Sequence, residues 1–139
     1  MEISDNGYAP IKKDIENRED IFLLLTAFYH QLLQDPTISY IFTDVAKIDL
    51  QHHLPILTDF WEMVLFHTDT YRKNAMQVHT NLNRMTPLTG IHFETWLAHF
   101  NKVIDNMYEG EKAFLAKQRA QSIATSMQIN IAKSANKTI

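Results

Sequence analysis

Histidine is the residue type in this chain that can take part in the widest range of chemistry. Imidazole titrates near neutral pH and is the commonest metal ligand in proteins, so it suits both acid–base and metal chemistry. Most histidines are nevertheless solvated or hydrogen-bonded residues without a chemical role, so the surrounding pattern must single out any that act. The seven histidines are His30, His52, His53, His67, His79, His92 and His99.

The most regular pair, His92 and His99, could hold a zinc ion. A spacing of seven residues brings two side chains to nearly the same face of a helix, where two imidazoles can converge. No third ligand stands nearby, although zinc sites use three or four protein ligands. A polar helix edge is therefore the favoured interpretation of this pair.

Several enzyme classes lack their defining motifs in this sequence. The chain has no His-Glu-x-x-His of zinc proteases and no Glu-x-x-His of carboxylate-bridged di-iron bundles. It also has no Gly-x-Ser-x-Gly elbow, and its three glycines are too scattered to form a phosphate loop. We assign no catalytic residue from the sequence.

Three polar side chains, those of Tyr29, His53 and Trp96, stand among apolar helical residues. Each combines a hydrogen-bond donor with a largely apolar body. In an ordinary core, each would donate to a backbone carbonyl. The residues alone favour that interpretation and leave a ligand-binding role open.

The positions of these side chains depend on segments with helical spacing. Apolar residues recur at steps of three and four over 21–33, 54–65, 93–108 and 113–127, which is the period of a helix with one buried face. A shorter segment, 71–82, has a weaker pattern because Met76, Val78 and His79 supply little apolar surface.

Capping residues, prolines and glycines indicate where the helices begin and end. Asn17 followed by Asp20 predicts a helix start, and Asp35-Pro36 predicts the end of that helix. We expect Pro55 near the first turn of the second helix and Gly110 between the last two helices. No segment alternates like a strand, so the chain is predicted to be all-α, as either a bundle or a globin-like arrangement.

Composition narrows the class of protein further. The chain has 139 residues, 45% of them hydrophobic and 21% charged, which suits one folded domain. A net charge of -3 without basic clusters argues against nucleic-acid binding, and the absence of cysteine excludes disulfides and thiolate ligands. We find no signal peptide and no stretch long enough to span a membrane, so we expect a cytoplasmic protein with no membrane partner. We also expect a monomer. We predict a polar lead-in over 1–16, one domain over 17–132 and a polar tail over 133–139.

Five ordered stretches of this chain resemble successive signature segments of the group III truncated haemoglobins. The most specific pieces are His53-Leu54-Pro55 followed by Phe60-Trp61, and Tyr71 eight residues before His79. Asn74-Ala75 departs from the Gly-x-Pro that is common in the family. The stretches are DIFLLLTAFYHQLLQDPTISYIF (20–42), HLPILTDFWEMVLF (53–66), YRKNAMQVHTNL (71–82), HFETWLAHFNKVIDNMYEGEKA (92–113) and RAQSIATSM (119–127).

The resemblance implies a truncated globin-like helical sandwich in a single globin domain. It also implies non-covalent haem b, with His79 as the proximal ligand of the iron. Tyr29, His53, Leu57 and Trp96 would line the distal ligand-binding side, and His53 is also a candidate sixth iron ligand. The residues implied to contact the haem are Phe42, His53, Leu57, Phe60, Trp61, Tyr71, His79 and Trp96, with Phe28 packing at the pocket.

The resemblance implies reversible binding, storage or sensing of dioxygen and other small gaseous ligands. Hydroxyl and indole donors stabilise negative charge on a bound ligand, so Tyr29 and Trp96 are expected to slow ligand escape. Carbon monoxide, nitric oxide and peroxide are further candidate ligands. The alternatives are a haem redox enzyme, either a nitric oxide dioxygenase served by a reductase or a peroxidase-type enzyme, and more remotely a helical interaction module without haem.

Overall fold

The computed structural model describes residues 12–45, 47–68 and 88–137, with side chains described as far as Lys133. The helices within these ranges are α1 (Arg18–Leu32), η1 (Ile41–Val45, a π-helix), α2 (Leu50–Phe66), α4 (Gly90–Met107) and α5 (Glu111–Lys137). No described residue lies in a strand, so the all-α prediction is confirmed. The predicted helix over 71–82 lies outside the described residues. None of the described helices is long and apolar enough to cross a membrane.

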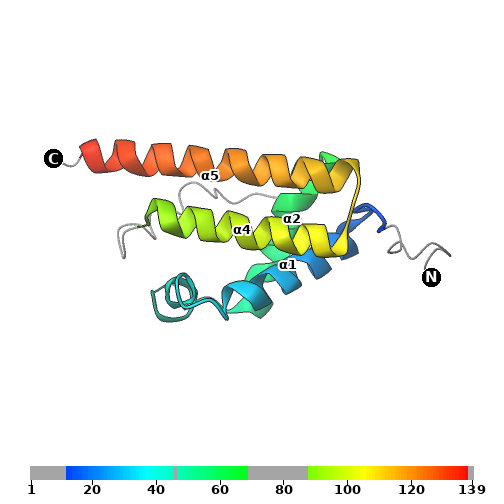
Figure 1. Ribbon diagram of the computed structural model, residues 1–139, viewed down its shortest axis with the longest axis horizontal. Helices are drawn as coiled ribbons and strands as arrows, with labels where there is room; N and C mark the ends of the chain where they lie inside the picture. The colour runs from blue at the N-terminus through cyan, green and yellow to red at the C-terminus, as the bar shows by residue number, and fades with distance from the viewer. Residues whose placement is uncertain (1–11, 46, 69–87, 138–139) are drawn as a thin grey trace, which may run out of the picture.

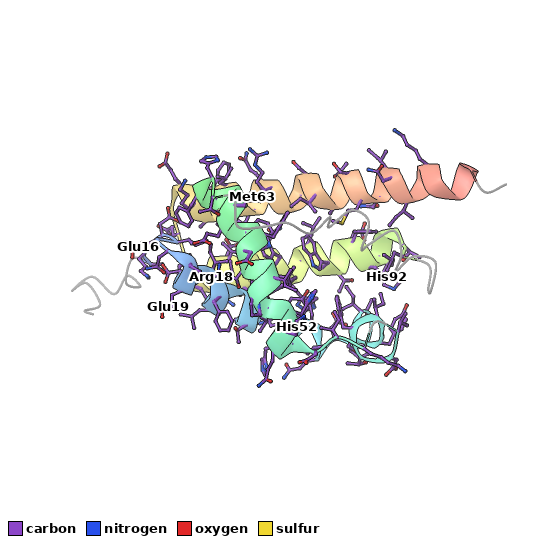
Figure 2. All side chains as sticks on the ribbon, turned by 180° about the vertical axis from the view of Figure 1, so that it is seen from behind. Glu16, Arg18, Glu19, His52, Met63 and His92 are labelled. Atoms are coloured by element: carbon purple, nitrogen blue, oxygen red, sulfur yellow. The ribbon has the colours of Figure 1, made fainter. Side chains whose placement is uncertain are left out.

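The helices form two packed pairs around a main core, and a smaller apolar cluster lies between α4 and α5. α4 and α5 lie side by side and antiparallel, and α1 and α2 pack against one face of this pair (Figure 1 and Figure 2). Gly110 lies between α4 and α5, as the sequence predicts. The segment after α1 projects beyond this packed body and returns through η1 to the start of α2 (Figure 1). This arrangement places η1 beside one end of the core.

Two helix starts are fixed by side-chain caps. The Asn17 side chain accepts a hydrogen bond from the Asp20 amide at 3.0 Å, which confirms the predicted start of α1. At α2, the Asp49 carboxylate accepts from the Gln51 amide at 3.1 Å. Capping satisfies amide groups that have no partner within the helix, so both boundaries follow from local chemistry.

Pro55 lies deeper in α2 than the sequence predicts. The Asp49 cap starts the helix at Leu50, which makes Pro55 its sixth residue, and the expectation of a first-turn position is wrong. Proline has no amide N–H, so the helix lacks the bond that this group would otherwise donate. One turn later the buried Thr58 hydroxyl donates to the Leu54 carbonyl at 2.7 Å. The helix continues through the proline to Phe66.

Four aromatic rings join α1, α2 and α4 at the centre of the core. Phe100, which is fully buried, lies 5.1 Å from Phe28 in an edge-to-face contact. It also stacks with Trp61 at 5.0 Å and with Trp96 at 5.6 Å, measured between ring centroids. Such pairs contribute about 0.5 to 1.5 kcal/mol each beyond their buried area. These ring contacts therefore hold the indole of Trp96 in a fixed orientation.

Residues before α1 cap the start of α5. The Asp14 carboxylate accepts hydrogen bonds from the amides of Lys112 at 2.8 Å and Ala113 at 2.9 Å. Negative charge is favourable at a helix N-terminus, because the free amides and the helix dipole point toward it. Ile15, which follows, is only 2% exposed. The described end of the predicted lead-in thus packs against the domain, while the predicted domain boundaries stay predictions.

A buried carboxylate stabilises the first turn of α1. Asp20 is 6% exposed, and both of its oxygens lie 2.9 Å from the Lys13 ammonium. Burial by itself would raise the pKa of this carboxyl, but hydrogen bonds from Lys13 and the Glu16 amide hold the pKa below its ordinary value. Asp20 is therefore ionised at neutral pH and ties the 13–16 segment to α1.

Candidate functional site

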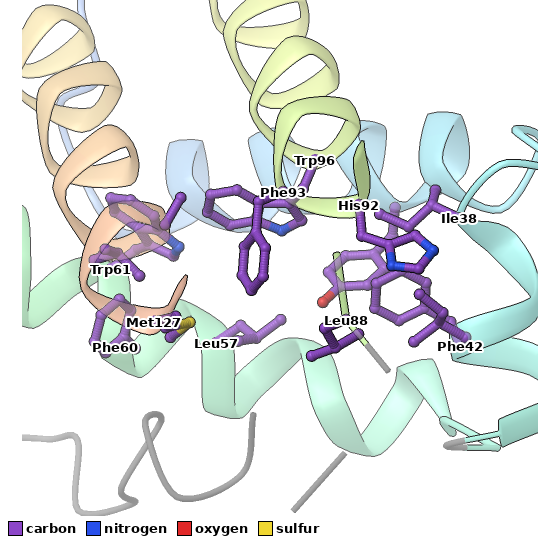
Figure 3. A pocket seen from close by; sticks show the side chains of 14 residues that line it. Ile38, Phe42, Leu57, Phe60, Trp61, Leu88, His92, Phe93, Trp96 and Met127 are labelled. Atoms are coloured by element: carbon purple, nitrogen blue, oxygen red, sulfur yellow. The ribbon is translucent and has the colours of Figure 1, made fainter. Parts of the chain in front are cut away.

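An apolar cavity opens between α2, α4, α5 and the segment that follows α1. Its volume is about 110 Å³. A single water needs a site of roughly 10 to 15 Å³ on a comparable measure, so the cavity has room for a larger group. Figure 3 shows Leu57, Phe93 and Trp96 around this space, with His92 and Phe42 at one end of it.

The structure brings six of the sequence-predicted pocket residues to this one cavity. They come from α1, η1, α2 and α4, which are separated in the chain. The six residues are Tyr29, Phe42, Leu57, Phe60, Trp61 and Trp96. Phe28 lies behind the wall, with its ring 5.5 Å from that of Tyr29 and 5.7 Å from that of Trp96.

Three predicted residues are not among the described residues that line the cavity. His53 does not line the cavity but contacts it through Tyr29, since the Tyr29 oxygen is 3.3 Å from His53 Nε2. Tyr71 and His79 lie outside the described residues, so their expected roles stay predictions. The haem-binding and ligand-binding roles of the six cavity residues are predictions as well.

Sequence reasoning missed eight cavity residues, most of them apolar. The helical period had marked Phe93, Ile123, Ala124 and Met127 as buried-face positions, but spacing cannot distinguish a packed core from a cavity wall. His92 had been considered only for its spacing of seven residues from His99. The missed residues are Ile38, Ile41, Leu88, His92, Phe93, Ile123, Ala124 and Met127.

Tyr29 provides a neutral hydroxyl in the cavity wall. It is 5% exposed, and this burial raises the pKa of its hydroxyl above the ordinary value. If His53 carries its proton on Nε2, that N–H donates to the Tyr29 oxygen and leaves the tyrosine proton for a ligand. With the other tautomer, Tyr29 donates to His53 instead. The tautomer of His53 therefore decides where the Tyr29 proton points.

Trp96 provides a second donor in the same wall. Its ring stacks on Phe100 with an interplanar angle of 3° and meets Phe28 edge-on. No residue in the described ranges accepts a hydrogen bond from its indole N–H. A fixed donor with no acceptor among the described residues, in a wall of an apolar cavity, is suited to a polar atom of a ligand.

His92 at the cavity end is held in one neutral tautomer. Its Nδ1 accepts from the backbone amide of Thr89 at 3.1 Å, so the proton of the neutral ring is on Nε2. That N–H donates to the Tyr40 oxygen at 2.9 Å. The bond joins the start of α4 to the segment before η1.

His99, two turns further along the same side of α4, contacts the other end of that segment. Its Nε2 lies 2.7 Å from the Asp35 carboxylate, and Gln31 lies 3.3 Å from Nδ1. The hydrogen bond from His99 lowers the pKa of Asp35 below its ordinary value. His92 and His99 therefore bind separate partners, and the described part of the chain contains no cluster of three or more metal-ligating side chains.

All-α domains with an apolar cavity between their helices include the globins. Comparison with known proteins shows which globins this chain is similar to. The chain is 26% identical, over 121 residues, to the group 3 truncated haemoglobin ctb of Campylobacter jejuni, covering 85% of this chain and 93% of that protein. It also matches a crystal structure of a group III truncated haemoglobin from Campylobacter jejuni, with a TM-score of 0.77 and 25% identity. That match covers 87% of this chain and 95% of the other. No family model matches the sequence.

These similarities extend over most of both chains. The fold is the truncated globin fold, and the resemblance to the group III truncated haemoglobins is confirmed. The chain is accordingly similar to the truncated haemoglobins in both sequence and fold.

Proposed function

We propose that this chain is a truncated globin that holds haem b non-covalently and binds dioxygen and other small gaseous ligands on it. The observation that carries the proposal is the cavity itself, where Tyr29, Trp96 and four further pocket residues expected from the sequence meet. The relatives are named as truncated haemoglobins, which supports the same conclusion. The absence of cysteine leaves non-covalent attachment as the mode of binding.

The chemistry of the cavity residues fits a haem. A porphyrin is a flat, largely apolar ring system. It would pack against the aromatic and aliphatic side chains that α2, α4, α5 and η1 contribute to the cavity. Polar groups are few and lie at defined places, with Tyr29 and Trp96 in the wall and His92 at one end. His79 would supply the iron ligand, as the family pattern implies.

When bound, the haem would supply the iron centre to which a gaseous ligand attaches. The residues of this chain would exclude water and stabilise the bound ligand. Leu57, Phe60 and Phe93 exclude water, which strengthens electrostatic interactions inside the cavity. Tyr29 and Trp96 donate hydrogen bonds to a ligand that gains negative charge, and such bonds contribute about 1.5 to 3 kcal/mol each. A donor set of this kind favours slow release over rapid exchange.

The same donors suit a second function, the consumption of peroxide or the oxidation of nitric oxide. Fixed hydrogen-bond donors also polarise an O–O bond. We rank gas binding first because a set of donors around the cavity favours tight holding of a bound ligand. Peroxidase turnover or aerobic nitric oxide consumption above that of free haem would reverse this ranking.

Titration of the purified protein with haemin tests the proposal. We expect saturation near one equivalent and a sharp Soret band. Leu57→Trp, which fills the cavity from α2, should weaken haem retention at least tenfold, whereas Ile129→Trp on the exposed face of α5 should leave it unchanged. Circular dichroism would confirm that both variants fold. Equal haem retention by both variants, or no Soret band in the wild type, would contradict the proposal.

A further inference from the structure

Residues 33–40, which we call the connecting segment, join α1 to η1 and carry part of the wall of the apolar cavity described above, the main cavity. Ile38 lies within this segment, and Ile41 and Phe42 directly follow it. All three line the main cavity. The Ile38 amide donates to the Asp35 carbonyl at 3.1 Å, which forms a local turn. A local turn does not fix a segment relative to another helix, so the position of this segment beside α4 depends on side-chain contacts.

Two histidines of α4 make polar contacts with the two ends of the connecting segment. Near its start, His99 Nε2 lies 2.7 Å from the Asp35 carboxylate. At its end, the His92 Nε2–H donates to the Tyr40 oxygen at 2.9 Å, and the two rings meet with centroids 5.9 Å apart. Figure 2 shows His92 on the side of α4 that faces this segment. The seven-residue spacing of the histidines therefore brings both contacts to one face of α4.

The start of α4 orients the bond between His92 and Tyr40. The amide of Thr89, the N-cap residue, donates to His92 Nδ1 at 3.1 Å, so the proton of the neutral ring is on Nε2 and faces Tyr40. Glutamate and glutamine are the usual residues that accept from an N-cap amide three positions earlier. An ionised glutamate would have no proton to donate to Tyr40, whereas histidine and glutamine each provide one acceptor and one donor. His92 therefore caps α4 and binds the connecting segment at once.

We propose that His92 is a positioning residue for the main cavity, which acts through Tyr40 to hold the connecting segment against α4 and thereby slows the loss of haem. Figure 3 shows His92 beside Ile38 and Phe42 at one end of the cavity. Release of Tyr40 would let this part of the wall move away from α4. The positioning of the segment depends on this chain alone, whereas the effect on haem rests on the proposed function.

Amide hydrogen exchange followed by NMR tests the positioning step without reference to haem. Tyr40→Phe keeps the ring but removes the accepting oxygen, and His92→Leu removes the donor. In both variants the Ile38 and Ile41 amides should exchange about fivefold faster than in the wild type. This factor corresponds to about 1 kcal/mol, the typical net contribution of one hydrogen bond. His92→Gln, which keeps an acceptor and a donor, should restore exchange toward the wild-type rate.

The double variant Tyr40→Phe/His92→Leu tests whether the two side chains act through one bond. Both substitutions remove the same interaction, so the double variant should exchange no faster than the faster single variant. His30→Leu is the matched control, because it removes an exposed imidazole that lies 3.2 Å from Gln34, also in the connecting segment. It should leave exchange at Ile38 unchanged. Wild-type exchange in both single variants, additive effects in the double variant or no rescue by His92→Gln would overturn the proposal.

Transfer of haem to an excess of apomyoglobin tests the effect on haem retention in haem-loaded protein. Tyr40→Phe and His92→Leu should lose haem at least threefold faster than the wild type, and His92→Gln and His30→Leu should not. Dioxygen dissociation should be unchanged in all four variants, because Tyr29 and Trp96 remain. Faster exchange with unaltered haem loss would overturn the role in haem retention. If the wild type fails to hold haem, the exchange rates still decide the positioning step, so failure of the proposed function remains distinguishable.

Discussion

Tyr29→Phe is expected to speed dioxygen dissociation from the haem-loaded protein by at least fivefold. The substitution keeps the ring and its contacts with Phe28 and Phe42 but removes the hydroxyl that can donate to a ligand. A lost hydrogen bond to a charged acceptor costs about 1.5 to 3 kcal/mol, and about 1.4 kcal/mol corresponds to a factor of ten in an equilibrium constant. Stopped-flow displacement of dioxygen by carbon monoxide measures the rate.

Tyr108→Phe is the matched control for this prediction. Tyr108 is also 5% exposed, but its hydroxyl donates to the Asp20 carbonyl at 3.0 Å, and it does not line the main cavity. Its removal should lower the free energy of unfolding by about 1 kcal/mol and leave dioxygen dissociation unchanged. An unaltered off-rate in Tyr29→Phe would show that its hydroxyl does not donate to the ligand.

Gly110→Ala is expected to lower the free energy of unfolding by about 2 to 4 kcal/mol, through backbone strain and crowding together. Gly110 has a φ of 146°, which residues with a Cβ rarely adopt. A Cβ at this position would also lie 2.5 Å from Asp14 Cγ. Because Asp14 caps α5, the side chain cannot retreat without losing its bonds to the Lys112 and Ala113 amides. Urea unfolding followed by circular dichroism measures the change.

Gly90→Ala is the matched control, since Gly90 is the first residue of α4 and Gly110 directly precedes α5. A Cβ there would meet only Gln128 Oε1, at 4.0 Å. Alanine is favoured over glycine in helices by about 1 kcal/mol, so this variant should be neutral or slightly more stable. Equal losses in the two variants would mean that the Asp14 cap does not account for the requirement for glycine at Gly110.

Much of the fold could be predicted from the sequence because local features of the chain determine where its helices begin and end. The Asn17 cap, the break at Gly110 and the helical period of the apolar residues fix where the chain can be helical, and the structure follows them. Pro55 shows the limit of such signals. A proline is favoured near a helix start, but the Asp49 cap set the start of α2 earlier and the helix tolerated the proline.

The site was predictable to a lesser extent, and through the family resemblance rather than through spacing. Tyr29 and Trp96 are 67 positions apart in the chain and lie on different helices, and hydrophobic spacing does not encode which helix faces meet. The α5 wall illustrates this point, since Ile123 and Met127 carry the same periodic signal as residues of the solid core. The hydrogen bonds of His92 and His99 to the segment after α1 likewise depend on tertiary packing alone.

The most direct test of the central claim is the absorption spectrum of protein loaded with haemin, reduced and exposed to carbon monoxide, for the wild type and His79→Ala. His30→Ala, which removes an exposed histidine of α1, is the control. The account predicts a Soret band that shifts with carbon monoxide in the wild type and in His30→Ala, and that is lost in His79→Ala unless imidazole is added. Unchanged spectra in His79→Ala would contradict the proximal assignment, and a colourless wild-type protein would contradict haem binding itself.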